Sequence, residues 1–368
     1  MIIDHLPGRT ITLNNEEHLF FSGTSYLGMG HQPQFREALM EGIAQYGTVF
    51  SASRNNNLKL KIYEEAEDFL AQWTGAEAAL TVTSGLLAGQ IAVQSIDNQR
   101  FIYATSVHPA IWRETPPQYF FKNYQDFAQR IIDVIEDKKN NPVVVCTNTI
   151  DPLRCEVYDF SWLAQLPQNQ DITLVFDDSH GIGITGNEGA GFLSRPDIKP
   201  LIEKVKSMPR VKIIVIASLA KALGIPGGVI LSDKKTIDTI RRNPLFVGAS
   251  PIVPAYLFAF LKAQNVYQQA REQVFFNINL YKNLIQKSLK KRENTEGVLL
   301  KTYGNYPVSF VFDNSLYDFL LKHKVLISSF SYPKPSDLPI TRIIISALHE
   351  ASDIEYLASI TNDFLTGN

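Results

Sequence analysis

Apolar runs alternate with amphipathic segments between residues 59 and 232 of the chain. The apolar runs are short and rich in β-branched residues, which is typical of strands covered on both faces. They lie at 78–82, 100–104, 142–147, 172–178, 212–218 and 227–232. Most of the intervals between them are long enough for a crossover helix. The pattern therefore predicts an α/β fold with a mostly parallel sheet between helices.

Helical spacing is clearest in two segments. The first, 59–73, carries apolar residues on one helical face and meets a helix-ending glycine at Gly75. The second, 254–292, is unusually long and suits a link between two domains. Beyond it, strand-like runs at 307–313, 324–330 and 341–347 alternate with helical segments. The expected organisation is an N-terminal segment at 1–45, a large domain at 46–265 and a small α+β domain at 266–368.

Composition and charge narrow the kinds of partner. The 368 residues are 45% hydrophobic and 20% charged, with a formal net charge of −2 and dispersed Lys and Arg. These values favour a small-molecule partner over nucleic acid or a membrane surface. The N-terminus has neither a basic leader nor an apolar signal core, so we expect a cytoplasmic protein. Cys146 and Cys155 are expected to be reduced thiols, since cytosolic disulfides are rare, and no metal-ligand pattern accompanies them.

Candidate chemistry begins in FDDSHGIGITGNEGAG (176–191), where two aspartates end a predicted strand. Open α/β sheets bind ligands at the carboxyl ends of their strands, so Asp177 is expected to face a ligand, and His180 follows it by three residues. A solvated turn is the alternative interpretation of this stretch taken alone. The glycines do not form a dinucleotide-binding fingerprint, because no G-x-G-x-x-G opens a helix after the first strand.

A second motif, IIVIASLAKALGIPGG (213–228), puts Lys221 after another predicted strand. A lysine amine forms a Schiff base with the aldehyde of pyridoxal phosphate. An aspartate such as Asp177 keeps the pyridine nitrogen protonated, so that the ring accepts electrons. The two motifs together predict a pyridoxal phosphate site. A surface lysine with its stem on apolar residues is the alternative for Lys221, and it leaves Asp177 and His180 unexplained.

The segment TSGLLAGQIAV (83–93) offers a cradle for a phosphate group. Ser84 and Gly85 end a strand and open a helix, whose first amides and dipole attract an anion, although an ordinary helix cap has the same sequence. Ser218 and Ser250 could add hydroxyl donors. His108 could stack on an aromatic ring or be a partly buried loop histidine.

The order of these motifs resembles the α-oxoamine synthase family of fold-type I, aspartate aminotransferase-like, pyridoxal phosphate-dependent enzymes. The likeness covers nearly the whole chain and is carried by FSGTSYLGMGHQP, TVTSGLLAG, SVHPAIW, FDDSHGIGITGNEGAG, SLAKALG and TRIIISALHEASDIE. It is strongest to the branch that contains 8-amino-7-oxononanoate synthase, of biotin biosynthesis, and 2-amino-3-ketobutyrate CoA ligase.

The resemblance implies a role for each candidate around the cofactor. It makes Lys221 the Schiff-base lysine and Asp177 the partner of the pyridine nitrogen. His180 would lie beside the phenolic oxygen and His108 over the ring face. The phosphate ligands that it implies are Ser84, Gly85, Leu86 and Ser218, with Ser250 reaching the phosphate of the neighbouring subunit in a homodimer.

Positions that would face the substrates match the family's motifs less closely than the cofactor positions do. Arg342 matches the family's carboxylate-binding arginine, and a bidentate guanidinium suits that task; its alternative is a surface arginine at a strand start. Thr24 lies where the family has an asparagine near the lysine and substrate. Asn57 stands where glycine is usual. Segment 148–154 is shorter than in the family, which leaves Asn148 or Thr149 as replacements.

Taken together, the resemblance implies an acyltransferase that condenses a small amino acid with an acyl-CoA and releases carbon dioxide and CoA. L-alanine is the preferred amino acid and glycine the second. An aminotransferase on the same scaffold is one alternative, because one fold supports many reactions. A catalytically silent protein that binds pyridoxal phosphate is another.

Overall fold

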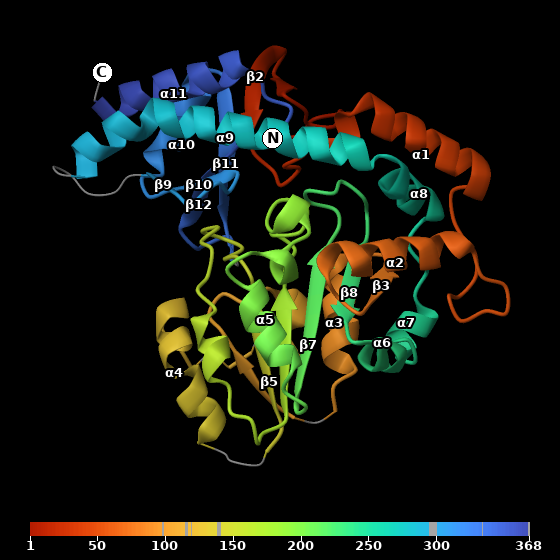
Figure 1. Ribbon diagram of the computed structural model, residues 1–368. Helices are drawn as coiled ribbons and strands as arrows, with labels where there is room; N and C mark the ends of the chain where they lie inside the picture. The colour runs from red at the N-terminus through yellow and green to blue at the C-terminus, as the bar shows by residue number, and fades with distance from the viewer. Residues whose placement is uncertain are drawn as a thin grey trace. The chain divides into compact units, whose positions relative to one another are not determined.

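The computed structural model describes residues 1–97, 99–114, 117–118, 120–137, 141–293, 300–332 and 334–366 (Figure 1). The chain divides into two compact units. The larger unit comprises Pro33–Pro152 and Val157–Gln264. The smaller unit comprises Met1–Gln32, Leu153–Glu156 and Asn265–Asn368.

In the described part of the larger unit, six strands form one sheet in the order β3-β8-β7-β6-β5-β4. Their bounds are β3 Ala78–Val82, β4 Arg100–Tyr103, β5 Val143–Asn148, β6 Ile172–Asp177, β7 Val211–Ser218 and β8 Gly228–Ser232. Strands β4 to β7 are parallel to one another, whereas β8 is antiparallel to both β3 and β7. The predicted α/β fold and mostly parallel sheet are confirmed. The exception, β8, follows β7 through a short loop and not through a crossover helix.

The described helices of this unit are α1 Pro33–Tyr46, α2 Lys61–Thr74, α3 Gly85–Gln94, α4 Tyr124–Glu136, α5 Lys199–Lys206, α6 Lys234–Ile240, α7 Pro244–Gly248 and α8 Pro254–Lys262. Helices α2, α3, α5 and α6 contact strands of the sheet, and α1 packs on α8. The predicted helix at 59–73 is α2, and Gly75 ends it with a φ of 78°. Helix α3 contacts β3, β7 and β8 (Figure 1). This contact fixes the first turn of α3 beside the ends of three strands.

The predicted helix at 254–292 is divided in two. Helix α8 ends at Lys262, and α9 runs from Gln264 to Glu293. Ala263 between them leaves helical geometry, with φ −98° and ψ 25°. The two compact units also divide at this point, between Gln264 and Asn265.

The smaller unit has a sheet of its own, in the order β1-β2-β11-β12-β10-β9 among its described residues. The bounds are β1 Thr10–Leu13, β2 Glu16–Phe21, β9 Leu300–Thr302, β10 Val308–Val311, β11 Val325–Ser331 and β12 Pro339–Ile344, with helices α10 Ser315–Lys322 and α11 Ala351–Thr366. Strand β2 pairs in parallel with β11. Residues 1–32 therefore group with the C-terminal part of the chain.

Candidate functional site

The carboxyl ends of the parallel strands of the larger unit meet at one edge of the sheet. Asn148 at the end of β5 is in register with Asp177 at the end of β6, and Asp177 with Ile216 of β7. Across the antiparallel strand, Gly228 pairs with both Ser218 and Val82. The segments that follow these strand ends therefore converge on the edge where α/β sheets bind ligands.

Asp177 and His108 lie close together at this edge. The Asp177 side chain is buried, and its Oδ1 accepts a hydrogen bond from the Ser179 amide at 2.9 Å. Its Oδ2 lies 3.9 Å from Nδ1 of His108. Burial lowers the pKa of His108, the Asp177 charge partly opposes this, and the Lys221 charge lowers that pKa further. The ring is therefore neutral at neutral pH, and its Nδ1 accepts from the Ala110 amide at 3.2 Å.

The His108 loop is held by Asn148. The Asn148 Oδ1 accepts from the His108 amide at 3.2 Å, and its Nδ2 donates to the Ser106 carbonyl at 2.9 Å. Ser106 adopts a φ of 58°, a left-handed conformation that an amide bracing both sides of the turn helps to maintain. Asn148 therefore holds the loop that carries His108.

Lys221 lies in the loop between β7 and β8. The Leu219 amide donates to the Gly227 carbonyl at 2.9 Å, and the Ile225 amide donates to the Leu219 carbonyl at 3.1 Å. These bonds close a compact loop with Lys221 half-buried within it. The amine is near enough to His108 for its charge to act on that ring. The structure thus brings Lys221, His108 and Asp177 together from three separate segments.

The first turn of α3 packs against the strand that leads to Lys221. Ser84 caps the helix, since its Oγ accepts from the Leu87 amide at 3.1 Å. The first intrahelical bond runs from Ala88 to the Ser84 carbonyl, so the amides of Gly85 and Leu86 precede it and are free of intrahelical partners. A Cβ on Gly85 would lie 2.6 Å from Cβ of Ser218. The missing side chain is therefore what allows this close approach.

These features fit a phosphorylated, cationic aromatic ring. The helix terminus offers backbone donors to a dianion, and the buried Asp177 carboxylate offers a counter-charge to a protonated ring nitrogen. The three groups that would contact the ring and its aldehyde, Asp177, His108 and Lys221, all belong to the larger unit.

The loop after Asp177 is hydrogen-bonded to the end of β7. The Ser179 Oγ accepts from the Ser218 amide at 2.8 Å, and His180 beside it is buried. Asp178 is also buried and bonds to Thr149 and to the Phe192 amide. Ser179 and Asp178 had no role in the sequence prediction, because Ser218 and Thr149, to which they bond, lie 39 and 29 residues away along the chain.

Two further residues of the predicted site are Ser250 and Arg342. Ser250 is exposed between α7 and α8, and it does not cap α8, whose N-cap residue is Val253 without a side-chain bond. Arg342 is not a surface residue at a strand start. It is 6% exposed within β12, where its Nη1 donates to the Leu153 carbonyl at 3.5 Å and its Cζ lies 4.9 Å from the Phe330 ring centre.

Arg342 and Thr24 belong to the smaller unit, and Thr24 is half-buried there. The Nη1 of Arg342 also lies 3.8 Å from Sγ of Cys155. Cys155 and Cys146 are both buried thiols outside any disulfide in the described residues. The segment Leu153–Glu156 groups with this unit although the residues around it do not. It therefore shapes the surroundings of Arg342.

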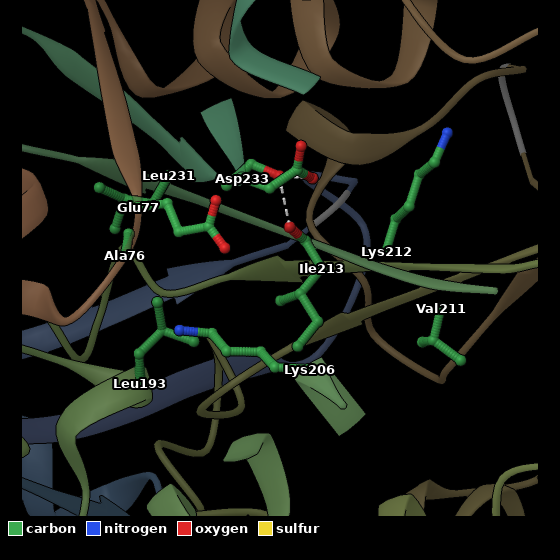
Figure 2. Close-up of a pocket in the computed structure, with 10 residues that line it drawn as sticks. Ala76, Glu77, Leu193, Lys206, Val211, Lys212, Ile213, Leu231 and Asp233 are labelled. Atoms are coloured by element: carbon green, nitrogen blue, oxygen red, sulfur yellow. Dashed lines mark hydrogen bonds between the residues drawn. The ribbon is translucent and has the colours of Figure 1, made fainter. Parts of the chain in front are cut away.

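A separate pocket of about 90 Å³ lies at the other end of β7 (Figure 2). It is lined by Val211, Lys212 and Ile213 at the start of that strand, together with Glu77, Lys206 and other residues. The Ser232 Oγ donates to the Ile213 carbonyl at 2.6 Å in its wall. Because Lys221 follows the opposite end of β7, this pocket is distinct from the candidate site.

Membrane-spanning helices and metal-binding clusters are both absent from the residues that the structure describes. None of their helices is long and apolar enough to cross a membrane. No group of three or more His, Cys, Asp or Glu among them could hold a metal ion.

Known proteins of one family are similar to this chain over most of its length. The chain matches the family Aminotransferase class I and II over residues 18–360. It is 24% identical over 373 residues to 8-amino-7-oxononanoate synthase of Petrotoga mobilis, which covers 97% of this chain and 91% of that protein. The serine palmitoyltransferase structure of Sphingomonas wittichii matches with a TM-score of 0.78 at 16% identity, over 98% of this chain and 90% of that one.

A serine palmitoyltransferase structure from S. paucimobilis, described as having a bound PLP–myriocin aldimine, matches with a TM-score of 0.79 at 15% identity, over 100% of this chain and 92% of that one. These structural likenesses confirm the predicted fold-type I architecture. The chain belongs to the aminotransferase class I and II family, and over nearly its whole length it is similar to the α-oxoamine synthases, which are pyridoxal phosphate-dependent acyltransferases.

Proposed function

We propose that this protein condenses a small amino acid with an acyl-CoA and releases carbon dioxide and CoA. The observation that carries the proposal is the grouping of Lys221, His108 and Asp177 at the carboxyl edge of the sheet. Asp177 is buried, and its Oδ2 lies 3.9 Å from His108, whose pKa responds to the Lys221 charge. An amine, a flat neutral ring and a buried carboxylate are the groups that pyridoxal phosphate requires.

The cofactor would be held by residues of the larger unit. Lys221 binds its aldehyde, Asp177 its ring nitrogen, and His108 the ring face, with His180 beside the phenolic oxygen. The phosphate is held by the α3 terminus and the end of β7, through Ser84, Gly85, Leu86 and Ser218. When bound, pyridoxal phosphate supplies an electron sink for the negative charge that develops at the α-carbon of the amino acid.

The protein's own residues then move protons and orient groups. The amine of Lys221 would accept the α-proton of the amino acid. The α-carbon forms a bond to the acyl carbon as the carbon–sulfur bond breaks, and CoA leaves as the thiol. Loss of the carboxylate as carbon dioxide follows, and a proton returns to the α-carbon. Asp177 would stabilise positive charge on the ring from its buried position.

Arg342 is the proposed ligand for the amino acid's carboxylate, with Thr24 as a further substrate contact. The guanidinium is buried in β12, and a buried guanidinium binds a carboxylate more strongly than an exposed one. L-alanine is the preferred amino acid, which would give the product of biotin biosynthesis. Glycine and, by analogy with the serine palmitoyltransferases, serine are the competitors to test.

We also propose that the active form is a homodimer in which Ser250 reaches the cofactor phosphate of the other subunit. Ser250 is exposed, and so are several large apolar side chains of the larger unit: Met40, Ile43, Val49, Leu58, Leu86, Leu245 and Val247. Such residues are common at subunit interfaces. Mixing inactive Lys221→Ala and Ser250→Ala proteins after reversible dissociation should restore part of the activity. An active monomer, or a fully active Ser250→Ala protein, would contradict shared sites.

The proposal is tested by thiol release across a panel of amino acids and acyl-CoA thioesters, with carbon dioxide measured in parallel. Equal amounts of free CoA and carbon dioxide are expected, and only when both substrates are present. Lys221→Ala is the inactive control. Amino-group transfer to a 2-oxo acid without CoA release would favour the aminotransferase alternative. Cofactor binding with no reaction of any pair would favour the catalytically silent one.

A further inference from the structure

Asp178 connects three parts of the larger unit through one buried side chain. It is 3% exposed and directly follows Asp177. Its Oδ1 accepts from Thr149 Oγ1 at 2.5 Å, in the segment after β5. Its Oδ2 accepts from the Phe192 amide at 2.8 Å, at the far end of the loop 179–192. Its own amide donates to Ile216 of β7 at 2.8 Å.

The loop closes tightly around this carboxylate. A Cβ on Gly181 would lie 2.0 Å from Oδ1, and a Cβ on Gly191 would lie 2.3 Å from Oδ2. Gly191 also has a φ of 81°, where a side chain is unfavourable. Both glycines are therefore needed for the loop to reach Asp178. A longer acid at position 178 would not fit the same enclosure.

The same loop carries groups that border the candidate site. Ser179 bonds to the Ser218 amide at 2.8 Å, and His180 follows it. Holding both ends of the loop to one carboxylate therefore fixes Ser179 and His180 against the strand that leads to Lys221. The link joins residues that are separated by up to 39 positions in sequence.

Few charged groups act on the Asp178 carboxylate to stabilise its ionised form. Burial raises the pKa of Asp178 to about 7, the bonds from Thr149 and Phe192 lower it, and Arg195 and Asp177 are the charged groups that act on it. Arg195 is itself paired with Asp197, 2.6 Å away. Both forms of Asp178 are therefore populated near neutral pH. Upon protonation, the Thr149 hydroxyl can instead donate to the Asp177 carbonyl, which is 3.4 Å away.

We infer that Asp178 is a positioning residue for the cofactor: it anchors the loop that carries His180, and its ionised form adds a second negative charge behind Asp177. The inference rests on the proposed function, in which Asp177 binds the ring nitrogen. Ionised Asp178 strengthens binding of a positively charged ring, and protonated Asp178 does not. Cofactor affinity should therefore depend on this one proton.

Asp178→Asn tests the charge with little change in shape. The amide can accept from the Phe192 amide through Oδ1 and donate to Thr149 through Nδ2, while the Thr149 hydroxyl turns to the Asp177 carbonyl. The dissociation constant for pyridoxal phosphate, measured by cofactor absorbance, should rise roughly tenfold at pH 8.5, equivalent to one pKa unit of charge interaction. At pH 5.5 variant and wild type should bind alike, because Asp178 is then protonated.

Thr149→Val provides a second, independent variant, with Thr149→Ser as its matched control. Removing the hydroxyl that stabilises ionised Asp178 should raise the pH at which cofactor affinity changes, relative to wild type. The serine variant should keep the wild-type pH dependence. For Asp178→Asn, the inference is overturned if the ratio of variant to wild-type dissociation constants stays near one at every pH. A ratio that is raised equally at all pH values, with a lower melting temperature, would mean a purely structural role and would also overturn it.

The result separates this inference from the function on which it rests. If wild-type protein does not bind pyridoxal phosphate, the proposed function fails. If wild type binds it and the variants show no pH-dependent difference, only the role of Asp178 fails.

Discussion

Gly85→Ala should push the first turn of α3 away from the end of β7. The added Cβ would lie 2.6 Å from Cβ of Ser218, 2.8 Å from its Cα and 3.0 Å from its amide nitrogen. Carbon atoms in ordinary contact are about 3.5–4.0 Å apart, so the two elements must separate by about 1 Å. Ser218 cannot yield easily, because its amide is bonded to Ser179 and its strand to β8.

The size of the effect follows from this overlap. Overpacking of a methyl group into a closed contact costs about 1–3 kcal/mol, which urea unfolding of the variant should show. A shift of about 1 Å also lengthens hydrogen bonds from the helix terminus beyond their normal range, so the dissociation constant for pyridoxal phosphate should rise by about tenfold or more.

Gly248→Ala is the matched control. Apart from its chain neighbours and the backbone of its own helix, no atom of the described residues lies within 4 Å of its added Cβ, and its φ is not in the left-handed region. We expect its stability to be unchanged or raised by up to about 1 kcal/mol, since alanine restricts the unfolded chain. If Gly85→Ala matched this control in both stability and cofactor affinity, the close approach of α3 to β7 would have no bearing on the site.

Three further predictions concern other buried groups. Asp177→Asn keeps the size of the side chain but removes its charge, so turnover at saturating cofactor should fall by roughly 100-fold or more with little change in melting temperature; unchanged turnover would assign the counter-charge elsewhere. Glu67→Ala should cost about 3–5 kcal/mol in urea unfolding, because buried Arg54 loses its counter-charge 3.0 Å away, whereas exposed Glu64→Ala on the same helix should cost little. Burial lowers the pKa of His349 from 6.5 to about 4, so its contribution to stability is present above pH 6.5 and is lost as the pH falls toward 4, by about 3 kcal/mol; His349→Gln should lack this part of the pH dependence.

The sequence was sufficient to predict the sheet and the edge that carries Asp177 and Lys221. Buried strands leave continuous apolar runs, and the runs that lead to the candidate site end at polar residues, Asp178 and Ser218. Ligands of open α/β sheets bind at that edge, so the pattern predicts both the strands and the place of the charged groups. The position of Gly75 at the end of α2 was predictable for a similarly local reason, the left-handed conformation at a helix terminus.

The remaining features depend on partners that are distant in sequence. Asn148 holds a loop 40 residues earlier, and Thr149 bonds to an aspartate 29 residues later. The pairing of β2 with β11 joins residues about 300 positions apart, for which no local pattern exists. The break at Ala263 has no Gly or Pro at that position to indicate it. Interactions of this kind are determined by tertiary packing and not by local propensity.

The most direct test of the central claim is to find which lysine carries the cofactor. Protein incubated with pyridoxal phosphate is reduced with borohydride and digested, and the modified peptide is identified by mass spectrometry. The account predicts a single stoichiometric modification on Lys221, which is lost in Lys221→Ala and kept in a Lys212→Arg control at the opposite end of β7. Modification at another lysine, or no retained cofactor in wild type, would contradict it.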